Sequence, residues 1–359
     1  MSTPDHLLLT GGTGHIGFAT LLYALQHTPL PIRLAVRSIE ASKPTILSRL
    51  DALNLSKTKS RLSFADVPDI TAPSAYTVAL TGITHIIHIA SPLPSAHLSR
   101  SPAEAEDIFI RPAVAGTLGL LESAKQVGSV KRIVLLSSVV ALIPAVHWGL
   151  QPAPPGVVFS ASSRTTAALG PYPTLQAGYS ASKARAFNEA EAWVQRERPE
   201  FGVLSVHPGW VIGRDEGKAD VAGVMSGTNT LLLGMCRGER RPMKSAGWAV
   251  HVRDVARVCV EALDAGRVEV ERGTVRGFMA GREIVWQEAL EVVRREFGEE
   301  VEEGVLSMEG AQESMEIAID SRETEEVFGF KFADWDEMVR SVVGHYIEVS
   351  KKSQTGKGV

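Results

Sequence analysis

Tyr179 and Lys183 lie four residues apart in a segment, 177–198, whose apolar spacing predicts a helix. Residues at that spacing lie one turn apart on the same helix face. A nearby ammonium favours the phenolate and lowers the pKa of a tyrosine, which is otherwise about 10. The pair could therefore move a proton near neutral pH. The spacing alone is common in ordinary helices, so its meaning depends on the rest of the chain.

A glycine-rich turn spans residues 10–17 and reads Thr-Gly-Gly-Thr-Gly-His-Ile-Gly. It follows a strand expected over 6–10 and opens a helix expected over 14–27. Glycines at such a turn let the backbone approach a pyrophosphate, and the helix N-terminus offers free N–H groups. Its position after the first strand favours nucleotide binding over a tight turn without a ligand.

Arg37 follows the second expected strand, 32–36, at the position where an acidic residue would bind the ribose hydroxyls of NAD. A guanidinium there suits a 2′-phosphate instead. Lys43 could add a second positive charge. The sequence therefore favours NADP(H) over NAD(H), with a solvated surface arginine as the alternative.

Strand and helix signals alternate through the first two-thirds of the chain. The expected strands are 6–10, 32–36, 61–65, 83–90, 130–137 and 203–206, and the expected helices are 14–27, 102–127 and 177–198. Strands this apolar are buried on both faces, as in a parallel sheet covered by helices. The pattern predicts an α/β fold with a doubly wound parallel sheet.

The regular pattern is interrupted between 143 and 175, where prolines and small residues predict a long loop. A short strand, 249–252, and helices over 255–265, 283–297, 321–328 and 333–350 are expected later. We expect a nucleotide-binding domain over 1–208, a mainly substrate-binding region over 209–350 that is interleaved with it, and a flexible tail over 351–359.

Composition excludes several classes of protein. The 359 residues carry 37 Lys and Arg against 41 Asp and Glu, and the basic residues are scattered, which argues against nucleic-acid binding. Residues 1–260 hold 25 Lys and Arg against 18 Asp and Glu, so this part is basic. Residues 261–359 hold 12 Lys and Arg against 23 Asp and Glu, so this part is acidic. This asymmetry suggests a cofactor domain with an acidic cap.

The two cysteines, Cys236 and Cys259, exclude a disulfide framework and a cysteine-rich zinc site. His85 and His88 lie three apart on an expected strand and face opposite sides, so a shared metal is not expected. No apolar run is long enough to span a membrane, and no signal peptide is recognisable. A cytoplasmic protein that is a monomer or a homodimer is expected.

The spacing Gly-x-x-Gly-x-x-Gly of the turn, followed by Ser137-Ser138 and then by Tyr-x-x-x-Lys, resembles the extended short-chain dehydrogenase/reductase family, which has a Rossmann-type fold. The resemblance implies that Tyr179 exchanges a proton with the carbonyl oxygen and that Lys183 holds the nicotinamide ribose. It also implies that a serine hydrogen-bonds the substrate oxygen. Ser138 is favoured over Ser137, because the catalytic residue of that motif is the second of the pair.

The segments His88–Pro92, Arg111–Thr117, Val206–Gly213 and Ile319–Ser321 resemble the dihydroflavonol-reductase-like and fungal aldehyde/ketone reductase branch. The expected cofactor contacts are Gly11, Thr13, Gly14, His15, Ile16, Gly17, Arg37, Lys43, Asp66, Val67, Ala90, Ser91, Tyr179, Lys183, Pro208, Gly209 and Val211. The expected substrate contacts are Ser91, Leu93, Ser138, Tyr172 and Trp210.

The chain departs from other branches of that family. Sugar-nucleotide dehydratases have an Asp-Glu pair after the catalytic Ser or Thr, where this chain has Val139 and Val140. Cinnamoyl-CoA reductases have an aromatic, cysteine-containing motif before the tyrosine, where residues 173–178 read Pro-Thr-Leu-Gln-Ala-Gly. The resemblance predicts NADPH-dependent reduction of a small or medium apolar aldehyde or ketone. The alternatives are an epimerase or lyase that uses bound cofactor transiently, and a non-catalytic NADP-binding regulator.

Overall fold

A computed structural model of the chain describes residues 5–93 and 99–355. Its centre is a seven-stranded parallel sheet in the order β10-β6-β5-β4-β1-β2-β3. The strands are β1 (Leu7–Thr10), β2 (Ile32–Val36), β3 (Leu62–Asp66), β4 (His85–His88), β5 (Arg132–Leu136), β6 (Gly202–Pro208) and β10 (Val275–Ala280). The doubly wound Rossmann-type fold is confirmed. The strand order reverses between β1 and β4, and this is the place where such sheets bind ligands.

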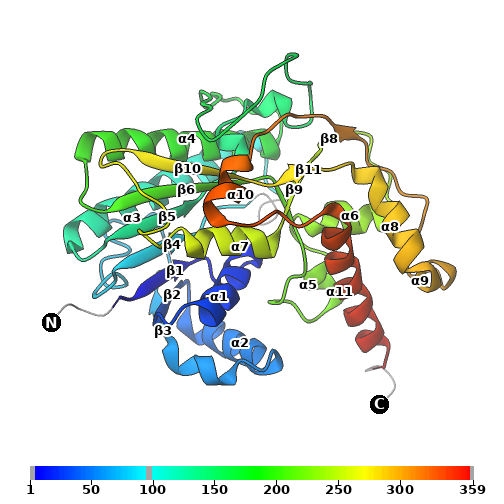
Figure 1. The fold of residues 1–359 in the computed structure, drawn as a ribbon, viewed down its shortest axis with the longest axis horizontal. Coiled ribbons are helices and arrows are strands. Elements are labelled where there is room, and N and C mark those ends of the chain that lie inside the picture. The colour runs from blue at the N-terminus through cyan, green and yellow to red at the C-terminus, as the bar shows by residue number, and fades with distance from the viewer. Residues whose placement is uncertain (1–4, 94–98, 356–359) are drawn as a thin grey trace.

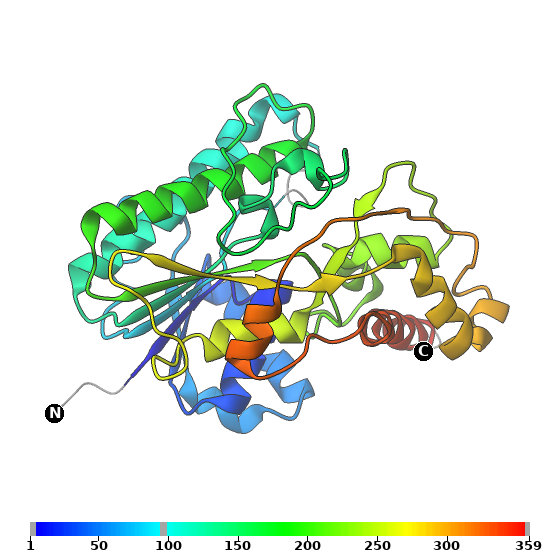
Figure 2. The same ribbon diagram turned by 45° about the horizontal axis from the view of Figure 1, so that its top comes forward.

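Helices cover both faces of the sheet (Figure 2). One face carries α1 (His15–His27), α2 (Ile39–Ala52), α7 (Val252–Glu261) and α10 (Arg322–Phe328), and the other carries α3 (Arg111–Val127) and α4 (Leu175–Glu197). Leu7, Leu8 and Leu9 are fully buried because β1 is covered on both sides. This burial explains the nearly continuous apolar runs of the strands.

Two elements of the central sheet and its flanking helices were not expected. The seventh strand, β10, pairs with β6 and contains Arg276 and Gly277, which interrupt its apolar run. Helix α2 contains Pro44 and is capped by Ser38, whose Oγ accepts a hydrogen bond from the backbone N–H of Ala41 at 3.3 Å. The polar residues of β10 and the proline inside α2 weaken the local pattern of each element.

The expected helix 102–127 is divided into three parts. A 3-10 turn (Pro102–Glu104) and a π-helical turn (Glu106–Ile110) precede α3. Pro112 in the first turn of α3 lacks an N–H group and favours a new helix start there. Helix α4 begins two residues earlier than expected, because Thr174 Oγ1 caps it by accepting from the N–H of Ala177 at 3.1 Å.

Most of the chain after residue 208 forms a second region, which lies beside the carboxyl end of β6 (Figure 1). It contains a three-stranded sheet, β11-β9-β7, and a two-stranded pair, β12-β8. Their bounds are β7 (Trp210–Ile212), β8 (Ser245–Ala246), β9 (Trp248–His251), β11 (Arg282–Glu283) and β12 (Ser314–Met315). The helices are α5 (Val221–Val224), α6 (Asn229–Cys236), α8 (Ala289–Glu296), α9 (Gly298–Glu302) and α11 (Trp335–Thr355).

One expectation for this region was wrong. The segment 283–297 is not one helix. Glu283 belongs to β11 and pairs with Trp248 of β9, and a 3-10 turn (Trp286–Glu288) precedes α8. Helix α11 continues to Thr355, so it extends into the segment 351–359 that was expected to be a flexible tail. The side chain of Lys351 contacts Glu300 at 2.9 Å, which holds this last part of the helix against α9. Residues 356–359 lie outside the described part of the chain.

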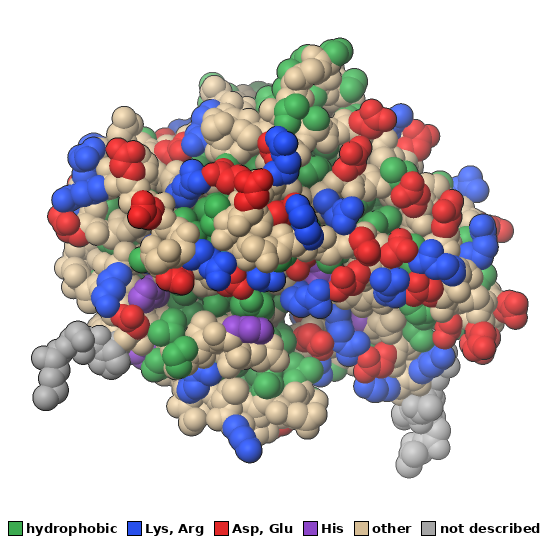
Figure 3. All heavy atoms as spheres, viewed as in Figure 1, with side chains coloured by type: hydrophobic (Ala, Val, Ile, Leu, Met, Phe, Trp, Pro, Cys, Tyr) green, Lys and Arg blue, Asp and Glu red, His purple; other side chains and the backbone are tan. Residues whose placement is uncertain are grey.

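The proline-rich segment 143–175 forms a long excursion above α4, and it is anchored at several points (Figure 1). Arg164 pairs with Glu191 of α4 at 2.6 Å, and Phe159 forms an isolated bridge with Ile319. Leu150, Val158 and Leu169 remain exposed, and Figure 3 shows apolar side chains gathered at the top of the molecule over this segment. Within the described ranges no helix is long and apolar enough to cross a membrane.

Candidate active site

The glycine turn after β1 adopts a backbone that only glycine tolerates at two positions. Gly11 has φ +72°, and a Cβ there would lie 2.8 Å from the backbone N of Ala90. A Cβ on Gly17 would lie 1.9 Å from the carbonyl oxygen of Gly11. Helix α1 starts after Gly14 with neither a side-chain cap nor an acidic residue in its first turn. Its free N–H groups and positive dipole end fit a pyrophosphate.

Thr10 fixes this turn against the end of β4. Its Oγ1 accepts from the N–H groups of Ile89 at 3.0 Å and Ala90 at 3.1 Å, so its proton is donated to Nδ1 of His88 at 2.9 Å. Burial and the charge of Lys183 lower the pKa of His88 to about 3. His88 therefore stays neutral and has a structural role, as an acceptor.

Arg37, at the end of β2, is exposed, and it pairs with no carboxylate among the described residues. Asp66 lies beside it and accepts the N–H of Ile39 at 2.7 Å, which helps to cap α2. Lys43 lies over the Phe64 ring, 5.8 Å from its centroid. A free guanidinium at this strand end fits the 2′-phosphate of NADP, and Asp66 already has a structural partner.

Lys183 and Ser91 connect α4 to the end of β4. Lys183 Nζ donates to Ser91 Oγ at 3.1 Å and lies 5.6 Å from the centroid of the Tyr179 ring. Burial lowers the pKa of Lys183 to about 8 and raises the pKa of Tyr179 to about 12. The expected lowering of the tyrosine pKa is therefore wrong for the protein alone, because loss of solvent outweighs the attraction of the cation.

Ser137 and Ser138 follow β5. The N–H of Ser137 donates to the carbonyl of Val206 at 2.8 Å and so extends the ladder between β5 and β6. Ser138 begins a 3-10 turn (Val139–Ala141), and its side chain makes no capping bond there. This turn packs against α4, the helix that carries Tyr179. Ser138 thus lies between the end of β5 and a turn that packs against the helix of Tyr179.

The chain passes close to its neighbours between β6 and β7. The N–H of Gly209 donates to the carbonyl of Ala280 at 3.1 Å, and a Cβ on Gly209 would lie 2.5 Å from Cδ1 of Trp248. Pro208 and Val211, on either side, are buried. Of two other cofactor candidates, Thr13 is exposed and Ile16 is half-buried.

The side chain of His15, an expected cofactor contact, is hydrogen-bonded within the protein. Its Nε2–H donates to the carbonyl of Gly213 at 3.0 Å, and Asn229 Nδ2 donates to the same oxygen at 2.7 Å. Burial lowers the pKa of His15, so the ring is neutral. The first turn of α1 is therefore fastened to the segment after β7, and the His15 backbone alone remains for phosphate binding.

The expected substrate residues Trp210, Tyr172 and Leu93 have different surroundings. Trp210 faces Trp148 of the proline-rich segment, with ring centroids 5.8 Å apart, and Trp286 at 6.5 Å. Tyr172 donates its hydroxyl to Ala168 within the segment and lies near the charges of Glu106 and Arg185. Leu93 is 51% exposed. Trp148 was missed, because a tryptophan in a proline-rich stretch carries no local signal.

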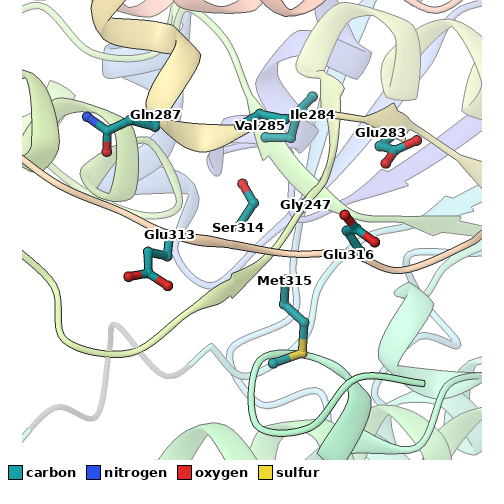
Figure 4. Close-up of a pocket in the computed structure, with 9 residues that line it drawn as sticks. All are labelled: Gly247, Glu283, Ile284, Val285, Gln287, Glu313, Ser314, Met315 and Glu316. Carbon is teal, nitrogen blue, oxygen red and sulfur yellow. The ribbon is translucent and has the colours of Figure 1, made fainter. Parts of the chain in front are cut away.

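A separate cleft of about 340 Å³ lies in the second region (Figure 4). Three carboxylates surround it, from Glu283, Glu313 and Glu316, and Glu313 pairs with Lys244 at 3.1 Å. None of the expected site residues lines this cleft. In the described ranges, no three His, Cys, Asp or Glu side chains are grouped so that they could hold a metal ion.

Comparison with known proteins shows the family to which the chain is similar. Residues 7–275 match the NAD dependent epimerase/dehydratase family. Ketoreductase CTB6 of Cercospora nicotianae is 34% identical over 354 residues, covering 97% of this chain and 96% of that protein. The NAD-dependent epimerase/dehydratase ALT6 of Alternaria alternata is 30% identical over 351 residues, covering 93% of this chain and 96% of that protein.

The crystal structure of yeast methylglyoxal/isovaleraldehyde reductase Gre2 complexed with NADPH shares the fold, with a TM-score of 0.76 and 19% identity over 97% of this chain and 99% of that chain. Similarity to the ketoreductase and to this structure fits the fungal reductase branch expected from the sequence. The chain belongs to the NAD dependent epimerase/dehydratase family of extended short-chain dehydrogenases/reductases.

Proposed function

We propose that this protein reduces a carbonyl group with NADPH, in the manner of the ketoreductases to which it is similar. The observation that carries the proposal is the hydrogen bond from Lys183 to Ser91 at 3.1 Å. It places the face of α4 that bears Tyr179 and Lys183 beside the end of β4, next to the glycine turn. Ser138 approaches the same helix from β5.

The residues of the site have distinct tasks in this reaction. NADPH, when bound, supplies the hydride. Tyr179 is protonated at neutral pH, because burial raises its pKa to about 12, so its Oη can donate a proton to the substrate oxygen. Ser138 Oγ holds that oxygen in place. Lys183, whose pKa is about 8, gains or loses its proton close to physiological pH.

The cofactor would lie along the carboxyl ends of β1, β2, β4 and β6. Gly11, Gly14 and Gly17 would hold the pyrophosphate against the start of α1, and Arg37 would bind the 2′-phosphate. The further proposed contacts are Thr13, the backbone of His15, Ile16, Lys43, Asp66, Val67, Ala90, Ser91, Pro208, Gly209 and Val211. The proposed preference for NADPH over NADH depends mainly on the free charge of Arg37.

The substrate would be a small or medium apolar aldehyde or ketone. Trp210 follows Gly209 directly, and its ring meets that of Trp148 ten residues after Ser138. The two indoles would form an apolar wall that excludes water from the reacting carbonyl. Residues 209–350, with the proline-rich segment, would thus cap the nucleotide-binding domain, and Leu93 and Tyr172 remain proposed contacts of the outer part of the site.

An NADPH-consumption screen over aldehydes, diketones, flavonoid-type ketones and cyclic imines tests this proposal. We expect stoichiometric oxidation of NADPH and formation of an alcohol with at least one aldehyde or ketone. Product analysis separates this from an epimerase or lyase, which gives no net redox change. Cofactor binding without turnover on the whole panel would contradict the proposal and favour a non-catalytic NADP-binding regulator.

A further inference from the structure

His207 lies on β6, next to the backbone of Ser138, and takes no part in the proposed reaction itself. Its side chain is fully buried. Nδ1 lies 3.2 Å from the carbonyl oxygen of Ser138, and Nε2 lies 2.8 Å from Oγ of Ser205, which is also fully buried. Both imidazole nitrogens are therefore hydrogen-bonded inside the protein.

These partners determine which nitrogen of His207 carries the proton. A carbonyl oxygen can only accept, so Nδ1 must be the donor to Ser138. Nε2 then accepts the hydroxyl proton of Ser205. The charges that face His207 are the cations of Arg164, from the proline-rich segment, and Lys183, from α4. Burial and these cations lower the pKa of His207 to about 3, so the neutral Nδ1–H form persists.

The bond from His207 completes the bonding of the Ser138 carbonyl. The same oxygen accepts the N–H of Ala141 at 3.0 Å, so both of its lone pairs are used. A carbonyl held from two directions cannot rotate, and the backbone at Ser138 is thereby fixed. The direction of the Cα–Cβ bond follows from the backbone, so the position of Ser138 Oγ is limited to its rotamers.

His207 also touches the helix that carries the other proposed catalytic residues. The Phe187 ring meets the imidazole edge-on, with centroids 4.8 Å apart. Phe187 lies one helical turn after Lys183 and two turns after Tyr179, so the three share a face of α4. His207 thus lies between this face of α4 and the end of β5, in contact with Phe187 on one side and with the Ser138 carbonyl on the other.

We propose that His207 is a positioning residue, which holds Ser138 in register with Tyr179 through the Ser138 carbonyl and the Phe187 ring. This inference rests on the proposed function, because it gives Ser138 a role in the reaction. A displacement of about 1 Å in such a site can cost a factor of about 100 in rate. The bond from His207 would prevent displacements of that size.

The first test compares His207→Phe with His207→Asn. Phenylalanine keeps the ring but cannot donate, and we expect kcat to fall by roughly 10- to 100-fold with the KM for NADPH unchanged. The amide of asparagine can still donate to the Ser138 carbonyl, and we expect it to restore much of kcat. Val343→Ala in α11, which removes methyl groups from a fully buried side chain elsewhere, controls for loss of stability. Equal kcat in His207→Phe and the wild type would overturn the inference.

The second test is a double-mutant cycle with Ser138→Ala. If His207 acts through Ser138, His207→Phe will lower kcat little further in the Ser138→Ala background. Multiplied effects of the two substitutions would overturn the inference and leave the proposed function intact. An unchanged kcat in Ser138→Ala alone would instead remove Ser138 from the proposed reaction, and the role of His207 with it. If His207→Phe does not fold, the cycle is run with Ser205→Ala in its place. We expect Ser205→Ala to lower kcat less than His207→Phe would, and to lower it little further in the Ser138→Ala background.

Discussion

Lys183 Nζ donates a hydrogen bond of 3.1 Å to Ser91 Oγ, and this contact joins the middle of α4 to the end of β4. The two residues are 92 positions apart in the chain, yet they meet where the strand order of the sheet reverses. The bond gives a buried ammonium one partner. Burial nevertheless lowers the pKa of Lys183 to about 8, so the site is arranged at a cost in stability.

Replacement of Lys183 by methionine should stabilise the fold and abolish turnover. A pKa lowered from 10.5 to about 8 means that the folded state binds the proton more weakly than the unfolded state. The cost is full below pH 8, about 3 kcal/mol, and it vanishes as the pH rises towards 10.5. After allowance for the lost bond to Ser91, we expect Lys183→Met to gain about 2 kcal/mol at pH 7.

Denaturant unfolding at pH 7 and pH 10 measures this gain. Lys125→Met is a suitable control, because Lys125 forms a surface pair with Glu197 at 2.6 Å and should contribute little. A gain that is equal at both pH values would show that the charge of Lys183 is not its cause.

Arg37→Gln should change the choice of cofactor. Hydrogen bonds to a charged group contribute about 1.5–3 kcal/mol, so the KM for NADPH should rise by roughly 10- to 100-fold. NADH has no 2′-phosphate, and its KM should stay the same. Steady-state kinetics with both cofactors measure this, with the exposed Lys57→Gln as the control. A parallel rise for NADH and NADPH would mean that Arg37 does not recognise the 2′-phosphate.

Gly17→Ala should weaken cofactor binding. The added Cβ would lie 1.9 Å from the Gly11 carbonyl and would force the glycine turn apart. A loss of only 1.4 kcal/mol raises the dissociation constant of NADPH tenfold, and we expect at least that factor by titration calorimetry. Gly119→Ala in α3 is the matched control, because its Cβ would meet nothing within 4 Å and should stabilise the helix by about 0.5–1 kcal/mol. Tight NADPH binding by Gly17→Ala would contradict the assignment of this turn.

The parts of the site that could be predicted from the sequence depend on local patterns. The glycine turn, the strand end at Ser138 and the spacing of Tyr179 and Lys183 are each contained within a few residues. The nucleotide-binding strands were also predictable, because burial on both faces requires continuous apolar runs.

The remaining features depend on contacts between distant segments. His15 has the local setting of a phosphate-binding residue, but its side chain meets Gly213, 198 positions away. Trp148 and Trp210 come from separate elements, so no spacing indicates that they pair. The raised pKa of Tyr179 follows from burial, which cannot be derived from its distance to Lys183 in the sequence.

Tyr179→Phe is the sharpest test of whether Tyr179 gives a proton to a carbonyl that is reduced with NADPH. The ring and its edge-on contact with Phe109 should remain, so NADPH should bind as tightly as it does to the wild type. Loss of the hydroxyl should lower kcat by roughly 10²- to 10⁴-fold on any ketone or aldehyde found in the screen. Full turnover by Tyr179→Phe, with NADPH binding unchanged, would show that Tyr179 is not the proton donor.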